Sequence, residues 1–318
     1  MKKISVVIPC YNDSNSIAQM CERLVKVFVE QLPQYDYEII YVDDCSPDNN
    51  KTWYEIRKVC KMDKRCKAVR NARNFGFYRN VFAAMRYGTG DATFMLFGDL
   101  QDPPEYLPEF VKYWEKGSRV VVGQRGNSYN KPLIRLARKV YYKAITKLSN
   151  NTQIEGLSGF GLYDRSFVKI LDDIEDIQPI LTGIITEYVR DIKVIPVVQE
   201  KGGRAKSNLN FWGKYDGAMM SITSYTKTLL RMATFIGALV GVLSVLYALF
   251  IVGYKILFWD TFEYGIPSLI AGMFFLGAVQ LFFLGILGEY VLSINNRSMK
   301  RPLVVVDECL NFEMETEE

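Results

Sequence analysis

Acidic side chains gather at two points where an apolar run of the sequence ends. After residues 39–42 come Asp43, Asp44 and Asp48, and after residues 93–97 come Asp99 and Asp102. Carboxylates grouped without histidine favour a hard divalent cation, Mg²⁺ or Mn²⁺, held by oxygen ligands and shared with a substrate diphosphate. Asp is also a common helix N-cap. That structural role suits Asp48 and Asp102 as well as a functional one does, whereas we expect Asp44 and Asp99 to be functional.

Four cationic side chains are candidates for binding the oxygens of an anion, although a lone cation is more often a solvated surface charge. They are Arg73, Arg125, Arg135 and Lys206. The formal net charge is only +4 and no long basic tract occurs, so the charge pattern predicts no nucleic-acid partner.

Several common chemistries are excluded by residues that the chain lacks. None of the 318 residues is a histidine, which rules out a Cys/His zinc site and a Ser/His/Asp triad. The six cysteines have no CxxC spacing, which is typical of reduced thiols in the cytosol. The turn after residues 4–8 has no GxGxxG motif, which disfavours an NAD site.

Residues 1–205 alternate between short apolar runs, rich in β-branched residues, and longer segments with helical spacing. The expected strands are 4–8, 39–42, 93–97 and 120–122, and the expected helices include 17–28, 53–60, 81–87 and 105–114. This alternation predicts an α/β domain with a mostly parallel sheet. Ligands of such sheets bind beyond the carboxyl ends of the strands, where both acidic clusters lie.

Two uncharged segments, 232–254 and 265–288, are each long enough to cross a membrane. We expect transmembrane helices over 232–258 and 265–293, joined as a hairpin, and a cytosolic tail over 294–318. A pair of buried core helices is the alternative. The stretch ahead of Pro9 is too short for a secretory signal, so the N-terminus is expected in the cytosol.

Basic residues flank the outer ends of the two segments, whereas their connection carries acidic residues. The flanking residues are Lys214, Lys227, Arg231, Arg297, Lys300 and Arg301, and the connection has Asp260 and Glu263 with Lys255 nearby. The positive-inside rule then predicts a multi-pass protein of the inner (cytoplasmic) membrane, with the α/β domain and both termini in the cytosol.

Residues 206–231 contain an amphipathic pattern ahead of the first uncharged segment. Its apolar side is Phe211, Tyr215, Met219, Ile222 and Leu229, and its polar side is Lys214, Ser221, Ser224, Lys227 and Arg231. This spacing predicts a juxtamembrane helix lying at the lipid interface. A helix packed on the soluble domain remains the alternative.

Six short motifs follow one another along nearly the whole chain. They are VIPCYN at 7–12, VDDCSPD at 42–48, RNFG at 73–76, DLQDPPE at 99–105, SGF at 158–160 and GEY at 288–290, followed by Arg301-Pro302. In this order, and with the hairpin, the chain resembles family 2 glycosyltransferases of the GT-A fold. The resemblance is to the polyprenyl-phosphate glycosyltransferases related to dolichyl-phosphate mannose synthase and the bactoprenol glucosyltransferases.

The resemblance implies three groups of site residues and a divalent metal, Mg²⁺ or Mn²⁺. The nucleotide sugar would contact Pro9, Tyr11, Asp13, Asp43, Asp44 and Arg73, with Asp44 accepting from the base. Asp99 and Gln101 would contact the metal and the donor diphosphate and, with Arg125, serve catalysis. The acceptor phosphate would contact Arg125, Arg135 and Lys206.

Two departures from the family pattern bear on these roles. The family often has Asp-x-Asp before Leu-Gln, and Phe97 stands at the first Asp position, which leaves Asp99, Gln101 and the diphosphate to hold the metal. The arginine that usually precedes Gly-x-Ser-Lys falls at Glu200, and the serine of that segment is Ala205. One phosphate contact is therefore in doubt.

The implied reaction is inverting transfer of a sugar from a nucleoside diphosphate sugar, UDP by resemblance, to polyprenyl (undecaprenyl) phosphate at the cytosolic membrane face. It would supply lipid-linked sugar for cell-surface glycans such as O-antigen. A phosphate acceptor is already an anionic nucleophile, so no strong general base is required. A processive polysaccharide synthase and a non-catalytic membrane scaffold are the alternatives, and small residues such as Gly237 and Gly272 leave a homo-oligomer open.

Overall fold

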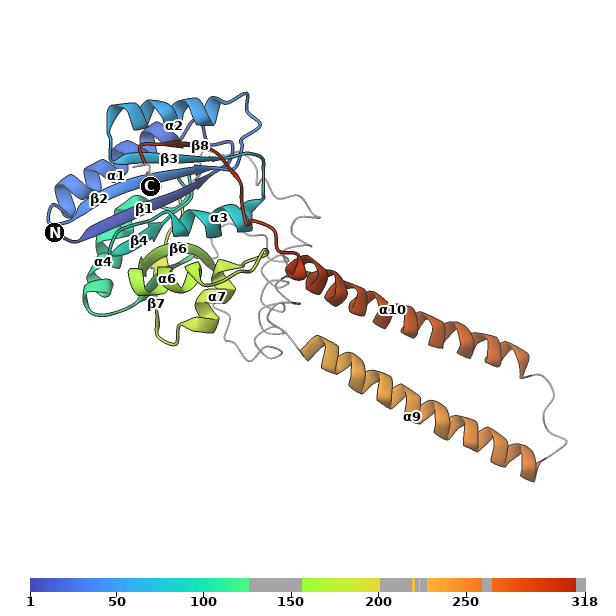
Figure 1. Ribbon diagram of the computed structural model, residues 1–318. Helices are drawn as coiled ribbons and strands as arrows, with labels where there is room; N and C mark the ends of the chain where they lie inside the picture. The colour runs from blue at the N-terminus through green and yellow to red at the C-terminus, as the bar shows by residue number, and fades with distance from the viewer. Residues whose placement is uncertain (126–155, 201–218, 221–222, 224–227, 259–264, 313–318) are drawn as a thin grey trace. The chain divides into compact units, whose positions relative to one another are not determined.

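An eight-stranded sheet in the order β7-β5-β6-β4-β1-β2-β3-β8 forms the centre of the α/β part of the chain in the computed structural model (Figure 1). The structure describes all residues except 126–155, 201–218, 221–222, 224–227, 259–264 and 313–318. The strands are β1 (Lys3–Cys10), β2 (Asp36–Asp43), β3 (Cys66–Asn71), β4 (Ala92–Met95), β5 (Val120–Arg125), β6 (Leu157–Asp164), β7 (Ile192–Val197) and β8 (Val306–Leu310). The helices are α1 (Ile17–Gln31), α2 (Lys51–Met62), α3 (Phe77–Arg86), η1 (Pro104–Tyr106), α4 (Leu107–Glu115), α6 (Arg165–Asp172), α7 (Leu181–Tyr188), α9 (Thr228–Leu257) and α10 (Ile266–Ser298).

Four neighbouring strands, β4, β1, β2 and β3, are parallel, and β5 is parallel to β7. Strand β6 is antiparallel to both β4 and β5, and β8 is antiparallel to β3. The predicted α/β class with a mostly parallel sheet is therefore confirmed. All four predicted strands are present, although the third ends at Met95 rather than at residue 97.

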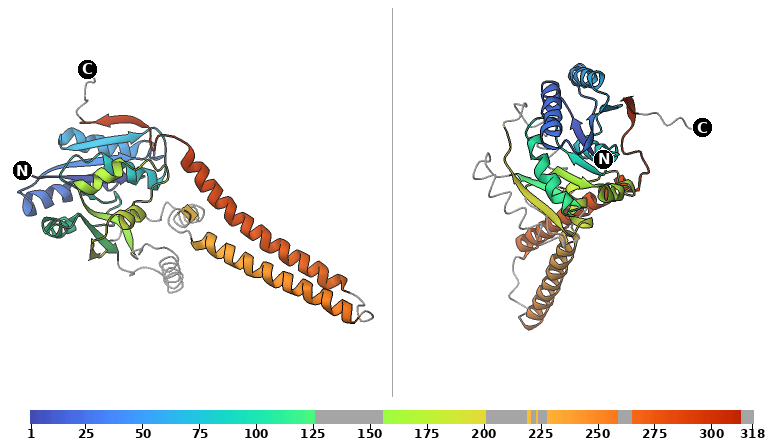
Figure 2. Two further views of the ribbon diagram at one scale, coloured as in Figure 1. Left: turned by 60° about the horizontal axis from the view of Figure 1, so that its bottom comes forward. Right: turned by 90° about the vertical axis from the view of Figure 1, so that its left-hand side faces the viewer.

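Alternation along the strands sends side chains into two separate cores. In β1, Val6 and Ile8 pack with α1, α2 and α4, whereas Val7 packs with α3, α6 and α7. Strand β2 divides in the same way, with Tyr41 on the first side and Val42 on the second. The result is a sheet covered by helices on both faces (Figure 2), which leaves its strand ends as the place for a ligand.

The last strand, β8, comes from the segment 294–318, which the sequence predicts as a cytosolic tail. Glu308 accepts hydrogen bonds from Trp53 Nε1 at 3.0 Å and from Arg57 Nη2, and thereby ties β8 to α2. Asn311 Nδ2 donates to the backbone carbonyls of Cys60 and Cys66, each at 2.7 Å. Residues of this segment therefore complete the sheet along β3.

The chain divides into two compact units. One holds Met1–Tyr142, Asn151–Trp212 and Lys300–Glu318, and the other holds Lys143–Asn150 and Gly213–Met299. The predicted domain end at residue 205 and most of the predicted juxtamembrane segment 206–231 lie outside the described residues.

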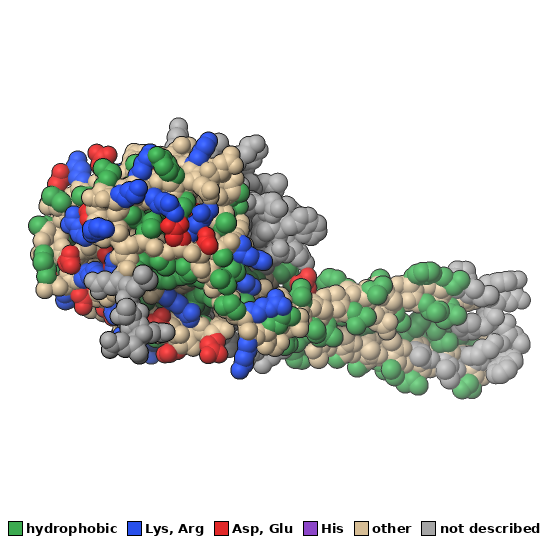
Figure 3. Space-filling model, turned by 45° about the horizontal axis from the view of Figure 1, so that its top comes forward, with side chains coloured by type: hydrophobic (Ala, Val, Ile, Leu, Met, Phe, Trp, Pro, Cys, Tyr) green, Lys and Arg blue, Asp and Glu red, His purple; other side chains and the backbone are tan. Residues whose placement is uncertain are grey.

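The second unit contains the helices α9 and α10, which run antiparallel to each other (Figures 1 and 2). Their apolar side chains point outward along their length, as Figure 3 shows in green, with Phe235 75% exposed and Phe274 77% exposed. Met232–Ile251 and Gly272–Ser298 are long and apolar enough to cross a membrane by length and composition. The two predicted spans thus correspond to helices, and α10 continues to Ser298, beyond the predicted end at 293.

A buried carboxylate anchors the amino-terminal ends of the parallel strands. Glu38 is 1% exposed and forms ion pairs with Lys3 at 2.9 Å and Lys67 at 2.8 Å. Ser5 Oγ and Thr89 N also donate to it. Burial by itself raises the pKa of Glu38, but the hydrogen bonds from these groups outweigh burial and hold the pKa at about 2. The ionised form is therefore strongly favoured in the folded protein.

We expect Glu38→Gln to destabilise the protein at neutral pH. Because folding lowers the pKa of Glu38 from 4.5, its contribution is present above pH 4.5 and is lost as the pH falls toward 2. The shift corresponds to about 3 kcal/mol at neutral pH. Thermal melting of the full chain in detergent, from neutral pH down to 4.5, measures the difference. The exposed Glu30→Gln is the control, and equal melting temperatures for Glu38→Gln and wild type at neutral pH would contradict the assignment.

Candidate active site

Three loops leave the carboxyl ends of β1, β2 and β4 side by side, because these strands are parallel neighbours. Each loop contains a non-glycine residue in the left-handed region: Asn12 at φ 59°, Cys45 at φ 52° and Leu100 at φ 59°. Such residues cost of order 1–2 kcal/mol each and persist where surrounding contacts hold them. Backbone strain is therefore concentrated at the edge where the sequence predicts a ligand.

Asp13 joins the β1 loop to the β4 loop. Its carboxylate is 2% exposed and accepts a hydrogen bond from Tyr11 N at 2.9 Å. A Cβ added to Gly98 would come within 2.9 Å of Asp13 Oδ2, and Ser16 Oγ donates to the Gly98 carbonyl. Only a residue without a side chain fits this approach, so Gly98 lets the loop bearing Asp99 lie directly against Asp13.

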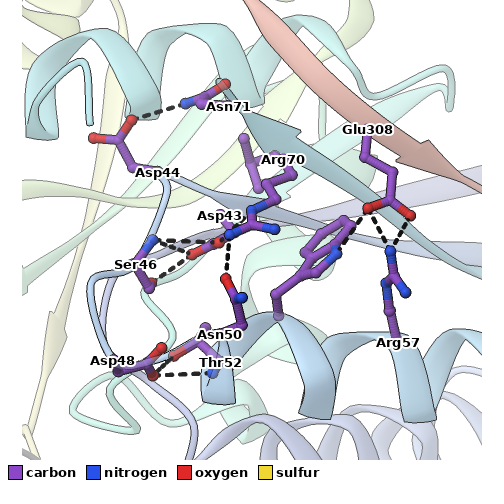
Figure 4. A network of polar contacts seen from close by, with 12 residues as sticks. Asp43, Asp44, Ser46, Asp48, Asn50, Thr52, Arg57, Arg70, Asn71 and Glu308 are labelled. Carbon is purple, nitrogen blue, oxygen red and sulfur yellow. Dashed lines mark hydrogen bonds and ion pairs between the residues drawn. The ribbon is translucent and has the colours of Figure 1, made fainter. Parts of the chain in front are cut away.

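Asp43, the last residue of β2, is fully buried. Ser46 donates to it through both its backbone N and its Oγ, and Arg70 Nε lies 3.9 Å from Asp43 Oδ2 (Figure 4). Burial raises the pKa of Asp43 despite these contacts. Asp43 therefore holds the loop after β2 through Ser46. Its contact with Arg70 keeps that arginine, at the end of β3, at the same edge of the sheet.

Asp44 binds the loop in front of α3. Its Oδ1 accepts from Asn71 Nδ2 and from Phe75 N, each at 2.9 Å, and its Oδ2 accepts from Gly76 N at 2.8 Å. The side chain is buried at 3% exposure. Asp44 thus fixes the segment that carries Arg73 relative to the end of β2.

Asp99 and Gln101 lie at the end of β4 and are each half-buried. Asp99 Oδ1 accepts from Gln101 N at 3.1 Å, and Gln101 Oε1 accepts from Gln199 Nε2 at 3.2 Å. Gln101 O also accepts from Glu200 N at 3.0 Å. The two predicted metal ligands therefore lie next to each other, and the segment after β7 forms hydrogen bonds with Gln101.

Asp102, which is buried, and Arg125, which is half-buried, form an ion pair. Arg125 Nε donates to Asp102 Oδ1 at 3.1 Å, and Arg125 Nη2 pairs with Asp102 Oδ2. Burial raises the pKa of Asp102, which is fully buried, and Arg125 opposes that shift. The Arg125 guanidinium also lies 5.5 Å from the ring centroid of Phe97. Asp102 therefore positions Arg125 beside Phe97 and does not cap a helix. The Nη1 amino group of Arg125 takes no part in the ion pair.

Asp48 has a structural role at the start of α2, although the N-cap residue of that helix is Asn50. Its Oδ2 accepts from Thr52 N at 2.9 Å and from Thr52 Oγ1 at 2.6 Å, at the start of α2. Glu200, at the position of the expected arginine, pairs with Arg23 at 2.9 Å, and Arg23 also pairs with Glu105. These carboxylates support helices and connections around the site.

The remaining predicted residues divide into described and undescribed ones. Pro9 is buried in β1, Tyr11 is half-buried in the next loop, and Arg73 is exposed with its guanidinium 5.3 Å from the Phe75 ring. Arg135 and Lys206 lie outside the described residues. The structure thus brings together the predicted residues of the β1, β2 and β4 loops.

Sequence reasoning missed Arg70 and Asn71 at the end of β3. Arg70 Nη2 donates to Asn50 Oδ1, and Asn71 Nδ2 also donates to Asn80 Oδ1 at 3.0 Å. Both residues end a six-residue strand, CKAVRN, whose charged positions conceal its apolar pattern. The nearby RNFG motif at 73–76 was the only local feature of the sequence that pointed to this part of the site.

The side chains available as metal ligands suit an ion that takes most of its ligands from a substrate. Among the described residues, no three His, Cys, Asp or Glu side chains gather closely enough to hold an ion by themselves. Asp99 offers a half-buried carboxylate and Gln101 an amide oxygen, both hard donors. Mg²⁺ commonly binds through one or two carboxylates together with substrate phosphates and water. The residues present therefore fit such an ion when a diphosphate is bound.

Comparison with known proteins identifies the family. The model of glycosyl transferase family 2 matches residues 5–171, which include every strand-end carboxylate described above. The chain belongs to glycosyl transferase family 2. This glycosyltransferase is 30% identical to the bactoprenol glucosyl transferase of Shigella phage SfX, over 96% of its own length and 98% of the relative. It is also 30% identical to the putative glycosyltransferase CsbB of Bacillus subtilis, over 96% and 92% of the two chains.

Solved structures support the GT-A fold of this glycosyltransferase. Glucosyl-3-phosphoglycerate synthase from Mycobacterium tuberculosis, solved with Mn²⁺, UDP-glucose and phosphoglyceric acid, matches with a TM-score of 0.50 at 17% identity. The match covers 70% of this chain and 78% of that one. The predicted α/β fold of the GT-A type is confirmed.

We expect Asp44→Asn to loosen the loop in front of α3. An amide in place of the carboxylate presents an NH₂ group to one of three donors, and an unpaired buried donor costs about 1–3 kcal/mol. Hydrogen exchange should therefore accelerate roughly tenfold or more at the amides of Phe75 and Gly76.

Mass spectrometry of peptides covering 73–77 measures this exchange. Asp173→Asn, a change of an exposed carboxylate, is the matched control. Unchanged protection of Phe75 and Gly76 in Asp44→Asn would show that Asp44 does not hold the loop.

Proposed function

We propose that this glycosyltransferase moves a sugar from a UDP-sugar to polyprenyl phosphate at the cytosolic surface of a membrane. The observation that carries the proposal is near full-length similarity to a protein named bactoprenol glucosyl transferase. The two long apolar helices support a lipid-borne acceptor, because the acceptor's tail remains in the bilayer. The UDP complex of the mycobacterial synthase, which shares the fold, makes UDP the nucleotide to test first.

The strand-end loops provide the donor site in this proposal. Pro9, Tyr11, Asp13, Asp43 and Asp44 would form or support the nucleotide pocket. Because the structure commits the Asp44 carboxylate to three donors of the chain, its contribution would come chiefly through the loop that it holds. Arg135 and Lys206 remain proposed contacts of the acceptor phosphate.

The chemistry follows from the charges at the site. A phosphate oxygen of the acceptor attacks the anomeric carbon, the bond from that carbon to the UDP oxygen breaks, and the configuration inverts. The acceptor oxygen is already anionic, so no side chain needs to remove a proton. A Mg²⁺ or Mn²⁺ ion, held by Asp99 and Gln101, would neutralise the leaving diphosphate. Arg125, held in place by Asp102, would add fixed positive charge.

The membrane arrangement completes the proposal. We place α9 and α10 across the inner membrane, with the catalytic domain and both termini in the cytosol. Basic residues at the outer ends of the two spans favour this orientation. The lipid-linked product would supply a cell-surface glycan pathway. The molecular mass of the purified protein in detergent would show whether it forms a homo-oligomer.

Purified full-length protein, supplied with undecaprenyl phosphate, Mg²⁺ or Mn²⁺ and a panel of UDP- and GDP-sugars, should release nucleoside diphosphate only when the lipid phosphate is present. Mass spectrometry should detect the glycosylated lipid, and a chelator should stop the reaction. Nucleotide binding without turnover across the panel would favour a non-catalytic scaffold instead.

We expect Asp99→Asn to reduce transfer about 100-fold or more, because it removes charge aimed at the leaving diphosphate. The melting temperature should change little, since Asp99 is half-buried and contributes little to either core. Asp91→Asn, at the opposite end of β4, is the control, and its activity should stay near wild type. Transfer retained by Asp99→Asn would overturn the metal and diphosphate role.

A further inference from the structure

The loop between β2 and α2, residues 44–50, has a backbone conformation that needs support from other elements. Cys45, Asn49 and Asn50 all lie in the left-handed region, at φ 52°, 57° and 62°. Asparagine enters this region more readily than most residues, but three such residues in one short loop still oppose folding. We call residues 44–50 the β2–α2 loop. Its conformation persists only where contacts from outside hold it.

The β2–α2 loop and the start of α2 support the β1 loop, which carries Tyr11 and Asp13. Ser46 Oγ accepts a hydrogen bond from Asn12 N at 2.9 Å. Thr52 Oγ1, in the first turn of α2, accepts one from Asp13 N at 3.0 Å. A shift of the β2–α2 loop would therefore also displace the β1 loop, and both loops belong to the proposed nucleotide site.

Arg70, at the end of β3, joins the two ends of the β2–α2 loop. Its Nε lies 3.9 Å from Oδ2 of Asp43, just ahead of the loop, and its Nη2 donates to Oδ1 of Asn50, the last residue of the loop (Figure 4). Its guanidinium carbon lies 5.7 Å from the centroid of the Trp53 ring, in the first turn of α2. The Arg70 side chain is only 18% exposed, so water competes little for these contacts. Arg70 therefore holds both ends of the loop in place.

Strand β8 supports Arg70 through Trp53. Arg70 and Glu308 are directly opposite each other in the antiparallel pair of β3 and β8, so their side chains lie on the same face of the sheet. Glu308 accepts from Trp53 Nε1 at 3.0 Å and pairs with Arg57. Hydrogen bonds from Arg57 and Trp53, together with the charge of Arg70, lower the pKa of Glu308. The carboxylate is therefore ionised at neutral pH and fixes the ring against which Arg70 lies.

The side chains of β8 contribute little to either core. Of the five residues of this strand, all of them described, Leu310 packs against one core, whereas Val306, Asp307 and Cys309 are exposed. Glu308 is half-buried, and its carboxylate contacts α2. The best-defined side-chain contacts of β8 are thus directed toward Trp53 and Arg70, and not into the interior.

We propose that β8 positions the donor site: Glu308, through Trp53 and Arg70, holds the β2–α2 loop in the conformation that binds the nucleotide of the sugar donor. This inference rests on the proposed function. Arg70 and Glu308 are positioning residues, because their charged groups are engaged with the chain itself. Affinity for UDP therefore depends on a strand that lies more than 200 residues beyond the other donor loops in the sequence.

The test measures UDP binding by calorimetry, and transfer kinetics, in the purified full chain carrying Arg70→Gln or Glu308→Ala. Each variant should raise the Kd for UDP about fivefold or more, because the loop must then be ordered at the moment of binding. The kcat at saturating donor and the KM for undecaprenyl phosphate should stay within about twofold of wild type. Hydrogen exchange should accelerate in peptides that cover 44–50.

Arg65→Gln and Asp307→Ala are the matched controls. Arg65 is an exposed arginine just ahead of β3, and Asp307 is an exposed carboxylate on β8 itself. Neither change should alter the Kd for UDP. Arg70→Lys and Glu308→Gln should recover part of the affinity, because the lysine keeps the charge and the glutamine keeps an oxygen acceptor for Trp53 Nε1.

Hydrogen exchange of the β8 amides and melting temperatures separate positioning from unfolding. Protection of Val306–Leu310 equal to wild type would show that β8 still pairs with β3 in a variant. If Glu308→Ala loosens β8 itself, Arg70→Gln carries the test alone, since that change leaves every side chain of β8 in place.

The inference and the proposed function fail in different ways. Wild-type protein that binds no UDP and transfers no sugar would refute the proposed function and this inference with it. Wild-type protein that binds UDP, with an unchanged Kd in both Arg70→Gln and Glu308→Ala, would overturn the inference alone. A Kd raised equally by the control variants would attribute the effect to lost stability and also contradict the inference. A matching rise in the KM for undecaprenyl phosphate would contradict it too, because β8 would then support the whole site and not the donor loops.

Discussion

The carboxylate of Asp44 joins three parts of the structure that are separate in the sequence: the end of β2, the side chain of Asn71 at the end of β3, and the backbone in front of α3. Both of its oxygens are used, and almost none of the group reaches solvent. The position of Arg73 and the first turn of α3 depends on this contact. The Phe77 ring at the start of α3 stacks on the Phe97 ring. The Asp44 contact therefore also helps to position the strand end that carries Asp99.

The aspartates near Asp44 have different structural roles. Asp43 and Asp102 are fully buried and hold Ser46 and Arg125, respectively. Asp48 holds the start of α2. Asp99 is half-buried, as Asp48 is, and its Oδ1 accepts a hydrogen bond from Gln101 N. Asp43, Asp48 and Asp102 therefore serve as structural contacts, and Asp99 remains the carboxylate that we propose for contact with the diphosphate.

The sequence was sufficient for the parts of the molecule that local patterns encode. Apolar runs predicted β1, β2, β4 and β5, and polar residues after these runs predicted the edge of the sheet at which a ligand would bind. Strands β3 and β8 were missed because Lys67 and Arg70 interrupt the apolar pattern of the first and because Asp307 and Glu308 interrupt that of the second. A strand at or near the edge of a sheet tolerates such residues, so hydropathy does not reveal it.

The roles of individual carboxylates were harder to predict because they depend on partners far away in the chain. Asp102 and Asp48 have similar local sequences, each near a proline and ahead of a helix. One binds Arg125, 23 residues away, and the other binds Thr52, four residues away. No spacing rule separates a local contact at the start of a helix from a partly buried ion pair when the partner is supplied by another strand.

Strand β8 also fixes an order of events during synthesis. It follows α10 in the chain, so the outer edge of β3 has no pairing partner until Val306–Leu310 leave the ribosome. By then both apolar helices have already been made. An unpaired strand edge invites pairing with other chains. A chain that stops within or before its apolar helices therefore keeps an open sheet edge, and only a chain synthesised through both helices can close it.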